Sequence, residues 1–127
     1  MIKIILDTNF LLIPSQFKID IFSEMDLIIH EKYALCAPEA VIGELKKLSE
    51  SKGKDGKAAK LALALIAKKN VNIIKGSKRT EYGDEAILDI ADKSTLVATQ
   101  DTELRKRLKL KGIRAIIMWQ KRHLRIV

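Results

Sequence analysis

Two acidic residues each come shortly after a short apolar run. Asp7 directly follows the segment IKIIL at residues 2–6, and Asp101 closes the string LVATQD after a second run at residues 95–98. Short, β-branched runs of this kind are typical of buried parallel strands. Because the carboxyl ends of parallel strands form one edge of a sheet, we expect both carboxylates to face a common crevice there.

Two further acids interrupt the apolar stripes of predicted helices. Helical spacing places Glu44 and Asp84 on stripes that are otherwise apolar: Val41, Leu45 and Leu48 for Glu44, and Ile87, Leu88 and Ala91 for Asp84. A buried carboxylate is costly unless it is paired, neutralised or bound to a metal. These two positions, where a helix would favour leucine, therefore indicate function.

Gathering four acids would add mutual repulsion, which a divalent cation would offset. Carboxylate oxygens suit hard ions such as Mg²⁺ or Mn²⁺, and the sequence has no His or Cys spacing of the kind that favours zinc. Each acid also has a purely structural explanation. Asp7, Asp84 and Asp101 could cap the turn or helix that follows, and Glu44 could reach water from the rim of its stripe.

Polar residues flank these acids. Thr8, Asn9 and Thr99 could orient the carboxylates or a metal-bound water, or they could serve local turns. The only histidines, His30 and His123, adjoin none of the acidic segments. We expect His30 at a helix end and His123 in a basic tail.

The elements that must position these residues alternate between strand-like and helix-like segments. Strands are predicted at 2–6, 33–36, 71–74, 95–98 and 115–119, and residues 124–127 could add an edge strand or form a tail. Helices are predicted at 19–30, 39–49, 58–69, 81–93 and 102–110, with loops at 49–57 and 76–79. Pro38 suits a helix start and Gly112 a helix end.

This alternation predicts an α/β protein. Strands joined through helices require right-handed crossovers, which gives a three-layer α/β/α sandwich around a central, mainly parallel five-stranded sheet. A chain of 127 residues suits one domain, residues 1–127. The Ala- and Leu-rich helix at 58–67 is apolar on more than one face, which suggests a homodimer interface.

The positive charge lies at the C-terminal end. Residues 1–102 contain 15 Lys/Arg and 15 Asp/Glu, whereas residues 103–127 contain nine Lys/Arg and one acid, so this basic segment carries the whole net charge of +8. Such asymmetry favours a nucleic acid over a membrane surface as the binding partner. The alternative is a basic face that only contacts solvent. The candidate phosphate contacts are Arg105, Lys106, Arg107, Lys109, Lys121 and Arg122. Trp119 could stack on a base, but core or interface packing is the stronger expectation at a strand end.

Composition points to a folded protein of a reducing compartment. The chain is 47% hydrophobic and 31% charged, and no apolar run approaches the roughly 20 residues of a membrane helix. Cys36 is the only cysteine, which excludes a disulfide within the chain. Without a signal-peptide pattern, we expect a cytoplasmic protein that does not bind a membrane.

The acidic segments together resemble the PIN domain family over nearly the whole chain. The resemblance rests on ILDTN with Asp7, VIGELKKL with Glu44, GDEAI with Asp84 and VATQD with Asp101, matched in order and spacing. No single segment is specific, but the ordered set is. The family often has Asn before the last acid, and here Gln100 stands in its place, which leaves the role of that side chain open.

The resemblance implies a Mg²⁺- or Mn²⁺-dependent endoribonuclease with a parallel sheet, often dimeric. By position, Asp7, Asp84 and Asp101 would hold metal, and Glu44 would complete the catalytic cluster. A metal-bound water would then attack phosphorus in line. The segment FLLIP and the basic end resemble archaeal and eukaryotic PIN nucleases of ribosomal RNA processing, which implies a ribosome-assembly partner. Toxin nucleases, which pair with an antitoxin, are the close alternative.

Three other functions fit less well. A non-catalytic PIN-like module would bind RNA or protein without cutting, but retention of all four acids argues against it. A phosphatase with an aspartate nucleophile usually needs a second Asp two residues on, where this chain has Asn9. A receiver domain would require paired acids near the first strand and a lysine after the last strand, and the sequence shows neither arrangement.

Overall fold

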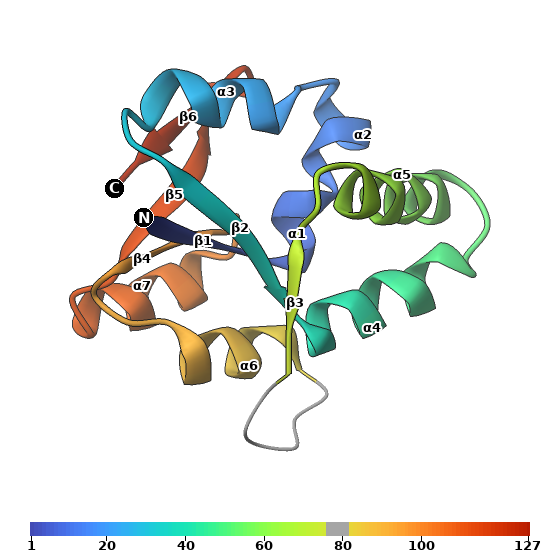
Figure 1. Ribbon diagram of the computed structural model, residues 1–127. Helices are drawn as coiled ribbons and strands as arrows, with labels where there is room; N and C mark the ends of the chain where they lie inside the picture. The colour runs from blue at the N-terminus through green and yellow to red at the C-terminus, as the bar shows by residue number, and fades with distance from the viewer. Residues whose placement is uncertain (76–81) are drawn as a thin grey trace.

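A six-stranded sheet forms the centre of the computed structural model, which describes residues 1–75 and 82–127 (Figure 1). The strand order is β3-β2-β1-β4-β5-β6, with bounds β1 Ile2–Leu6, β2 Tyr33–Pro38, β3 Asn72–Ile74, β4 Thr95–Ala98, β5 Arg114–Trp119 and β6 His123–Ile126. Strands β1 to β5 are parallel, which confirms the predicted mainly parallel sheet. The sheet has one strand more than the predicted five, because the C-terminal segment, predicted as an edge strand or a tail, forms β6 and pairs antiparallel with β5.

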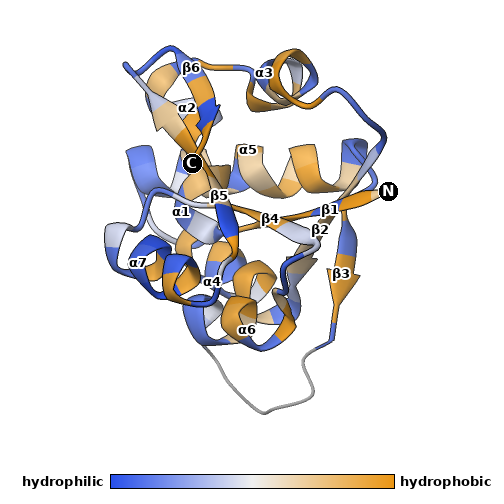
Figure 2. Cartoon of the chain, turned by 90° about the vertical axis from the view of Figure 1, so that its left-hand side faces the viewer, coloured by the Kyte–Doolittle hydropathy of each residue, from blue (hydrophilic) through white to orange (hydrophobic). Residues whose placement is uncertain are grey.

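Helices cover both faces of this sheet, as the alternating pattern predicts. Their bounds are α1 Thr8–Leu11, α2 Ile13–Phe17, α3 Ile21–Ile28, α4 Glu39–Ser49, α5 Lys54–Lys68, α6 Gly83–Ile90 and α7 Thr102–Leu110. Helices α2, α3 and α5 lie on one side of the strands, and α6 and α7 lie on the other (Figure 2). The short helices α1 and α2 were not predicted.

The central strand β1 explains where a functional crevice can form. Ile4, Ile5 and Leu6 are at most 1% exposed, because both faces of β1 are covered. From β1 the chain moves outward to β2 and β3 and then returns to β4 on the other side of β1. The order of strands therefore reverses between β1 and β4, and at such a reversal a crevice forms outside the carboxyl ends of the two strands.

Three sequence predictions about element ends were wrong. Residues 54–57 belong to α5 rather than to a loop, and the positive φ of 87° at Gly53 lets the helix start there. Helix α6 ends at Ile90, since Asp92 Oδ1 accepts hydrogen bonds from the N–H and hydroxyl of Ser94 and so forms a turn. Helix α3 is shorter than 19–30, because Asp20 caps it. The predicted loop at 76–79 lies outside the described residues.

Trp119 does not pack in the core of the chain. Its side chain is 41% exposed, and the Arg125 guanidinium carbon lies 4.1 Å from the centroid of its ring. A cation–π contact with the neighbouring edge strand β6 thus takes the place of core packing, and packing at an interface stays a prediction. Separately, none of the described helices has the length and apolarity required to span a bilayer.

Candidate active site

All four predicted acids line one cavity of about 320 Å³ at the carboxyl ends of β1 and β4. The lining residues are Asp7, Thr8, Asn9, Leu12, Glu44, Asp84 and Asp101. Asp7 comes from the end of β1, Asp101 from the residue before α7, Glu44 from α4 and Asp84 from the first turn of α6. Two strand ends and two helices, distant in sequence, therefore bring their carboxylates to one place.

Asp7 is the most deeply buried of these acids, at 5% exposure. Its Oδ1 accepts a hydrogen bond from Thr8 N–H at 2.8 Å, and its Oδ2 accepts one from the Thr99 hydroxyl at 2.6 Å. Burial raises the pKa of Asp7 above its usual value, and the nearby Glu44 and Asp101 raise it further against those two hydrogen bonds. An ionised Asp7 therefore calls for positive charge in the cavity.

Thr99 links the ends of β1 and β4. Besides donating to Asp7, its fully buried hydroxyl accepts a hydrogen bond from Asp101 N–H at 3.0 Å. Asn9 strengthens the same link, because its Oδ1 accepts the Gln100 N–H at 2.9 Å and its backbone carbonyl accepts the Gln100 amide at 3.3 Å. The side chain of Gln100, whose role the sequence left open, thus positions the loop that carries Asp101.

Glu44 is held by Thr8, whose hydroxyl donates to Glu44 Oε1 at 2.7 Å. The first residue of α6, Gly83, lies against the same oxygen, and a Cβ at that position would overlap it. Glycine at 83 therefore lets α6 approach α4 and brings the next residue, Asp84, to the cavity. The sequence contained this signal in the segment GDEAI, but its meaning depends on packing between two helices.

The capping alternatives divide among the acids. Asp101 does cap α7, since its Oδ1 accepts from the N–H groups of Glu103 at 2.9 Å and Leu104 at 3.2 Å. Asp7 likewise accepts from the first N–H of α1. Asp84 is not a cap, because Tyr82 occupies that position and makes no side-chain capping bond. Helix capping therefore does not explain why position 84 carries an acidic residue.

The donor set fits a hard divalent cation, because every cavity acid offers carboxylate oxygens. Within residues 1–75 and 82–127, however, no three acidic, His or Cys side chains are placed closely enough to hold one ion by themselves. Mg²⁺ usually keeps several waters and binds through one or two carboxylates together with substrate phosphate. The spread of Asp7, Asp84 and Asp101 around the cavity is compatible with that mode.

The predicted phosphate-binding residues do not gather at one place. Arg107 bonds Glu85, the residue after Asp84, at 3.0 Å, while Lys106 pairs with Glu103 at 3.4 Å. The remaining four fall in two groups: Arg105 and Lys109 line a separate hollow of about 500 Å³, and Lys121 and Arg122 form the β5–β6 turn. Strand β6 packs beside α3, away from α4 and α6 in both views (Figures 1 and 2).

Neither histidine joins the cavity. His30 lies two residues after α3, as expected, with its Nε2 3.1 Å from the carbonyl of Leu27. His123 belongs to β6 rather than to a tail, and its Nδ1 lies 2.9 Å from Glu24 Oε1 on α3.

Comparison with known sequences gives one family and two curated relatives. A family model described as a PIN-like domain matches residues 4–121. Ribonuclease VapC4 of Methanocaldococcus jannaschii is 34% identical over 131 residues, which cover 99% of this chain and 97% of that protein. The rRNA-processing protein fcf1 of Schizosaccharomyces pombe is 30% identical over 113 residues, covering 87% of this chain and 55% of that protein.

Solved structures give the same fold. The structure of the PIN domain endonuclease Utp24 matches with a TM-score of 0.79 and 26% identity, covering 98% of this chain and 90% of that one. VapBC-1 from nontypeable Haemophilus influenzae matches with a TM-score of 0.60 over 90% of this chain and 98% of that one. At 12% identity the second match shows a likeness of fold alone.

Proposed function

Because this chain belongs to the PIN-like domain family, we propose that it is a divalent-metal-dependent endoribonuclease, which hydrolyses phosphodiester bonds of RNA. The observation that carries the proposal is the single cavity lined by Asp7, Glu44, Asp84 and Asp101. Nucleases of this family generally use divalent metal ions. The relatives called a ribonuclease and a PIN domain endonuclease support the same activity.

In this proposal Asp7, Asp84 and Asp101 hold Mg²⁺ or Mn²⁺, and Glu44 completes the catalytic set. When bound, the ion supplies an activated water and offsets charge on the phosphate. The chain's own contribution is orientation. Thr8 and Thr99 each fix one oxygen of Asp7, and Thr8 also fixes Glu44, so the acidic side chains are held before RNA arrives.

We further propose precursor ribosomal RNA as the substrate, with a ribosome-assembly protein as partner. The relative called an rRNA-processing protein supports this role, and the +8 charge suits binding to RNA. A toxin-type ribonuclease with an antitoxin partner is the second candidate, because Ribonuclease VapC4 matches nearly end to end. Growth arrest on expression, relieved by a co-expressed partner, would favour the toxin role. Altered precursor-rRNA ends after depletion would favour processing.

A cytoplasmic location belongs to the same proposal, since a reducing compartment suits a chain with Cys36 as its only cysteine.

The decisive experiment compares the wild type with Asp7→Asn on labelled single-stranded RNA in Mn²⁺, Mg²⁺ or EDTA. We expect cutting only with metal and a loss of about 10²-fold or more in Asp7→Asn, since even residues behind a metal ligand contribute ~10–100-fold. Asp55→Asn, the same change at an exposed acid in the first turn of α5, should cut normally. If the wild type binds RNA but does not cut it with any metal, the proposed enzymatic activity is wrong. If Asp7→Asn cuts RNA normally, the proposed active site is wrong.

A further inference from the structure

A second, larger hollow of about 840 Å³ lies beside the acidic cavity, between α4 and the start of α6. Glu44 lines both spaces, so the hollow adjoins the proposed cleavage site at this residue. We call it the α4 hollow; its lining residues include Gly43, Glu44, Lys47, Leu48, Ser51 and Tyr82. Its size falls within the ~300–1,000 Å³ of small-ligand pockets.

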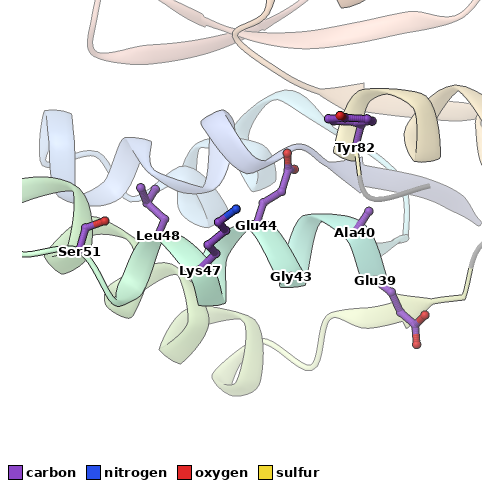
Figure 3. Close-up of a pocket in the computed structure, with 8 residues that line it drawn as sticks. All are labelled: Glu39, Ala40, Gly43, Glu44, Lys47, Leu48, Ser51 and Tyr82. Atoms are coloured by element: carbon purple, nitrogen blue, oxygen red, sulfur yellow. The ribbon is translucent and has the colours of Figure 1, made fainter. Parts of the chain in front are cut away.

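Tyr82 forms one wall of the α4 hollow. It directly precedes α6, is 69% exposed, and lies two residues before Asp84. In Figure 3 its ring lies across the hollow from α4, on the side toward which Glu44 extends. An exposed aromatic ring beside a phosphodiester-cutting site is a stacking platform for a base that has left its own stack.

On the α4 side of the hollow, opposite Tyr82, Gly43 has no side chain and so exposes the helix backbone. It sits in the interior of α4, where glycine is less favourable than alanine. In the part of the chain that the structure describes, no atom lies within 4 Å of a Cβ built at Gly43, and its φ is not positive. Neither packing against those residues nor backbone conformation therefore requires glycine. A ligand that approaches the helix backbone would explain it.

Lys47 supplies positive charge one helical turn after Gly43 and three residues after Glu44. Figure 3 shows its ammonium on the same side of α4 as the Glu44 carboxylate. Glu39 also lines the hollow, but its carboxylate points away from Tyr82. An aromatic wall, an open backbone and a lysine thus adjoin the acidic cavity. This combination matches the base and the phosphate of a nucleotide.

We propose that the α4 hollow binds one unstacked nucleotide of single-stranded RNA next to the phosphate that is cut, with its base against Tyr82 and its phosphate at Lys47. The inference rests on the proposed ribonuclease function and specifies its substrate class. A paired base stays stacked within its helix and cannot reach Tyr82, so the hollow selects single strands over duplexes.

The test measures binding of a fluorescein-labelled single-stranded oligoribonucleotide by anisotropy in EDTA, where no cleavage occurs. Tyr82→Leu should weaken binding about five-fold or more, whereas Tyr82→Trp should retain it. Lys47→Met should weaken binding and lower the salt slope by about one, whereas Lys46→Met, an exposed neighbour outside the hollow, should have little effect.

Gly43→Leu gives the sharpest readout, because stability and binding should change in opposite directions. Leucine favours the helix, so the urea midpoint should rise, while its side chain fills the hollow and weakens RNA binding about five-fold or more. Normal RNA binding by both Gly43→Leu and Tyr82→Leu would overturn the assignment and leave the hollow to a protein ligand or to none. Equal affinity for a duplex of the same sequence would also overturn it.

The two proposals fail separately. If the hollow variants lose RNA binding but the wild type cuts no RNA with any metal, the nucleotide site stands and the enzymatic function falls. If the wild type cuts and Asp7→Asn does not, while the hollow variants bind and cut normally, the function stands and the nucleotide site falls.

Discussion

Replacing Thr99 with valine removes one hydroxyl group from the most buried part of the acidic cavity. Thr99 is 0% exposed, donates to Asp7 Oδ2 at 2.6 Å and accepts from Asp101 N–H at 3.0 Å. Valine has nearly the same shape, so packing is kept and only the hydrogen bonds are lost. A bond to a charged group contributes ~1.5–3 kcal/mol, and a buried N–H left without a partner costs ~1–3 kcal/mol.

We expect Thr99→Val to lower the free energy of unfolding by ~2.5–4 kcal/mol, in the lower half of the combined range, because Asp101 is only partly buried. Urea unfolding followed by circular dichroism in EDTA measures this at pH 7. The same variant should cut RNA ~10–100-fold more slowly, because Asp7 loses the group that orients one of its oxygens.

Thr99→Ser is the matched control, since it keeps the hydroxyl and loses only a methyl group. Loss of a buried methyl group costs ~1 kcal/mol. Apolar packing alone would make the serine variant the less stable of the two, whereas the hydrogen bonds make it the more stable. A valine variant that equals or exceeds the serine variant in stability, with normal cleavage, would refute the reasoning.

Three further predictions concern other parts of the chain. Asp20 caps α3 and its pKa is lowered, first by the Ser23 hydroxyl, so its contribution is present above the usual value of 3.8 and is lost as pH falls through the lowered pKa. Asp20→Ala should therefore lower the free energy of unfolding by ~1 kcal/mol at pH 7 and by progressively less in acid. Asp20→Asn keeps a capping side chain and should lose this pH dependence. A loss of stability in Asp20→Ala that does not change with pH would contradict the prediction. Leu61 is 40% exposed on α5 and belongs to the predicted homodimer face. Leu61→Lys should therefore convert a dimer to a monomer in sedimentation. A wild type that is monomeric at high concentration would show that the predicted interface is wrong. Changing Lys121 and Arg122 together to alanine should weaken RNA binding and lower its salt slope by about 1–2, and an unchanged slope would show that the β5–β6 turn does not contact RNA.

Local sequence determined much of the secondary structure. The predicted bounds of α4, β4 and α7 agree with the structure, because each has a clear apolar pattern and a recognisable boundary residue. The ends of α5 and α6 were harder, since Gly53 and Asp92 act through backbone conformation and turn hydrogen bonds that apolar periodicity does not report.

The sequence also determined which acids would meet. Asp7 and Asp101 were found from strand ends, and Glu44 and Asp84 from apolar helix stripes, and all four line one cavity. Strand ends and helix faces can be read locally, because β-strands and α-helices have fixed periods. Once a parallel sheet is inferred, its topology places those positions at one edge.

Only the tertiary structure decided how these acids are held and what surrounds them. The contact of Gly83 with Glu44, the bonds from Thr99 to two strand ends, and the hollow between Gly43 and Tyr82 all join elements distant in sequence. The same holds for the basic segment, a single run in sequence that the fold divides among the ion pair with Glu85, the hollow lined by Arg105 and Lys109, and the β5–β6 turn. Such contacts depend on where one element packs against another, and the pattern within each element does not contain that information.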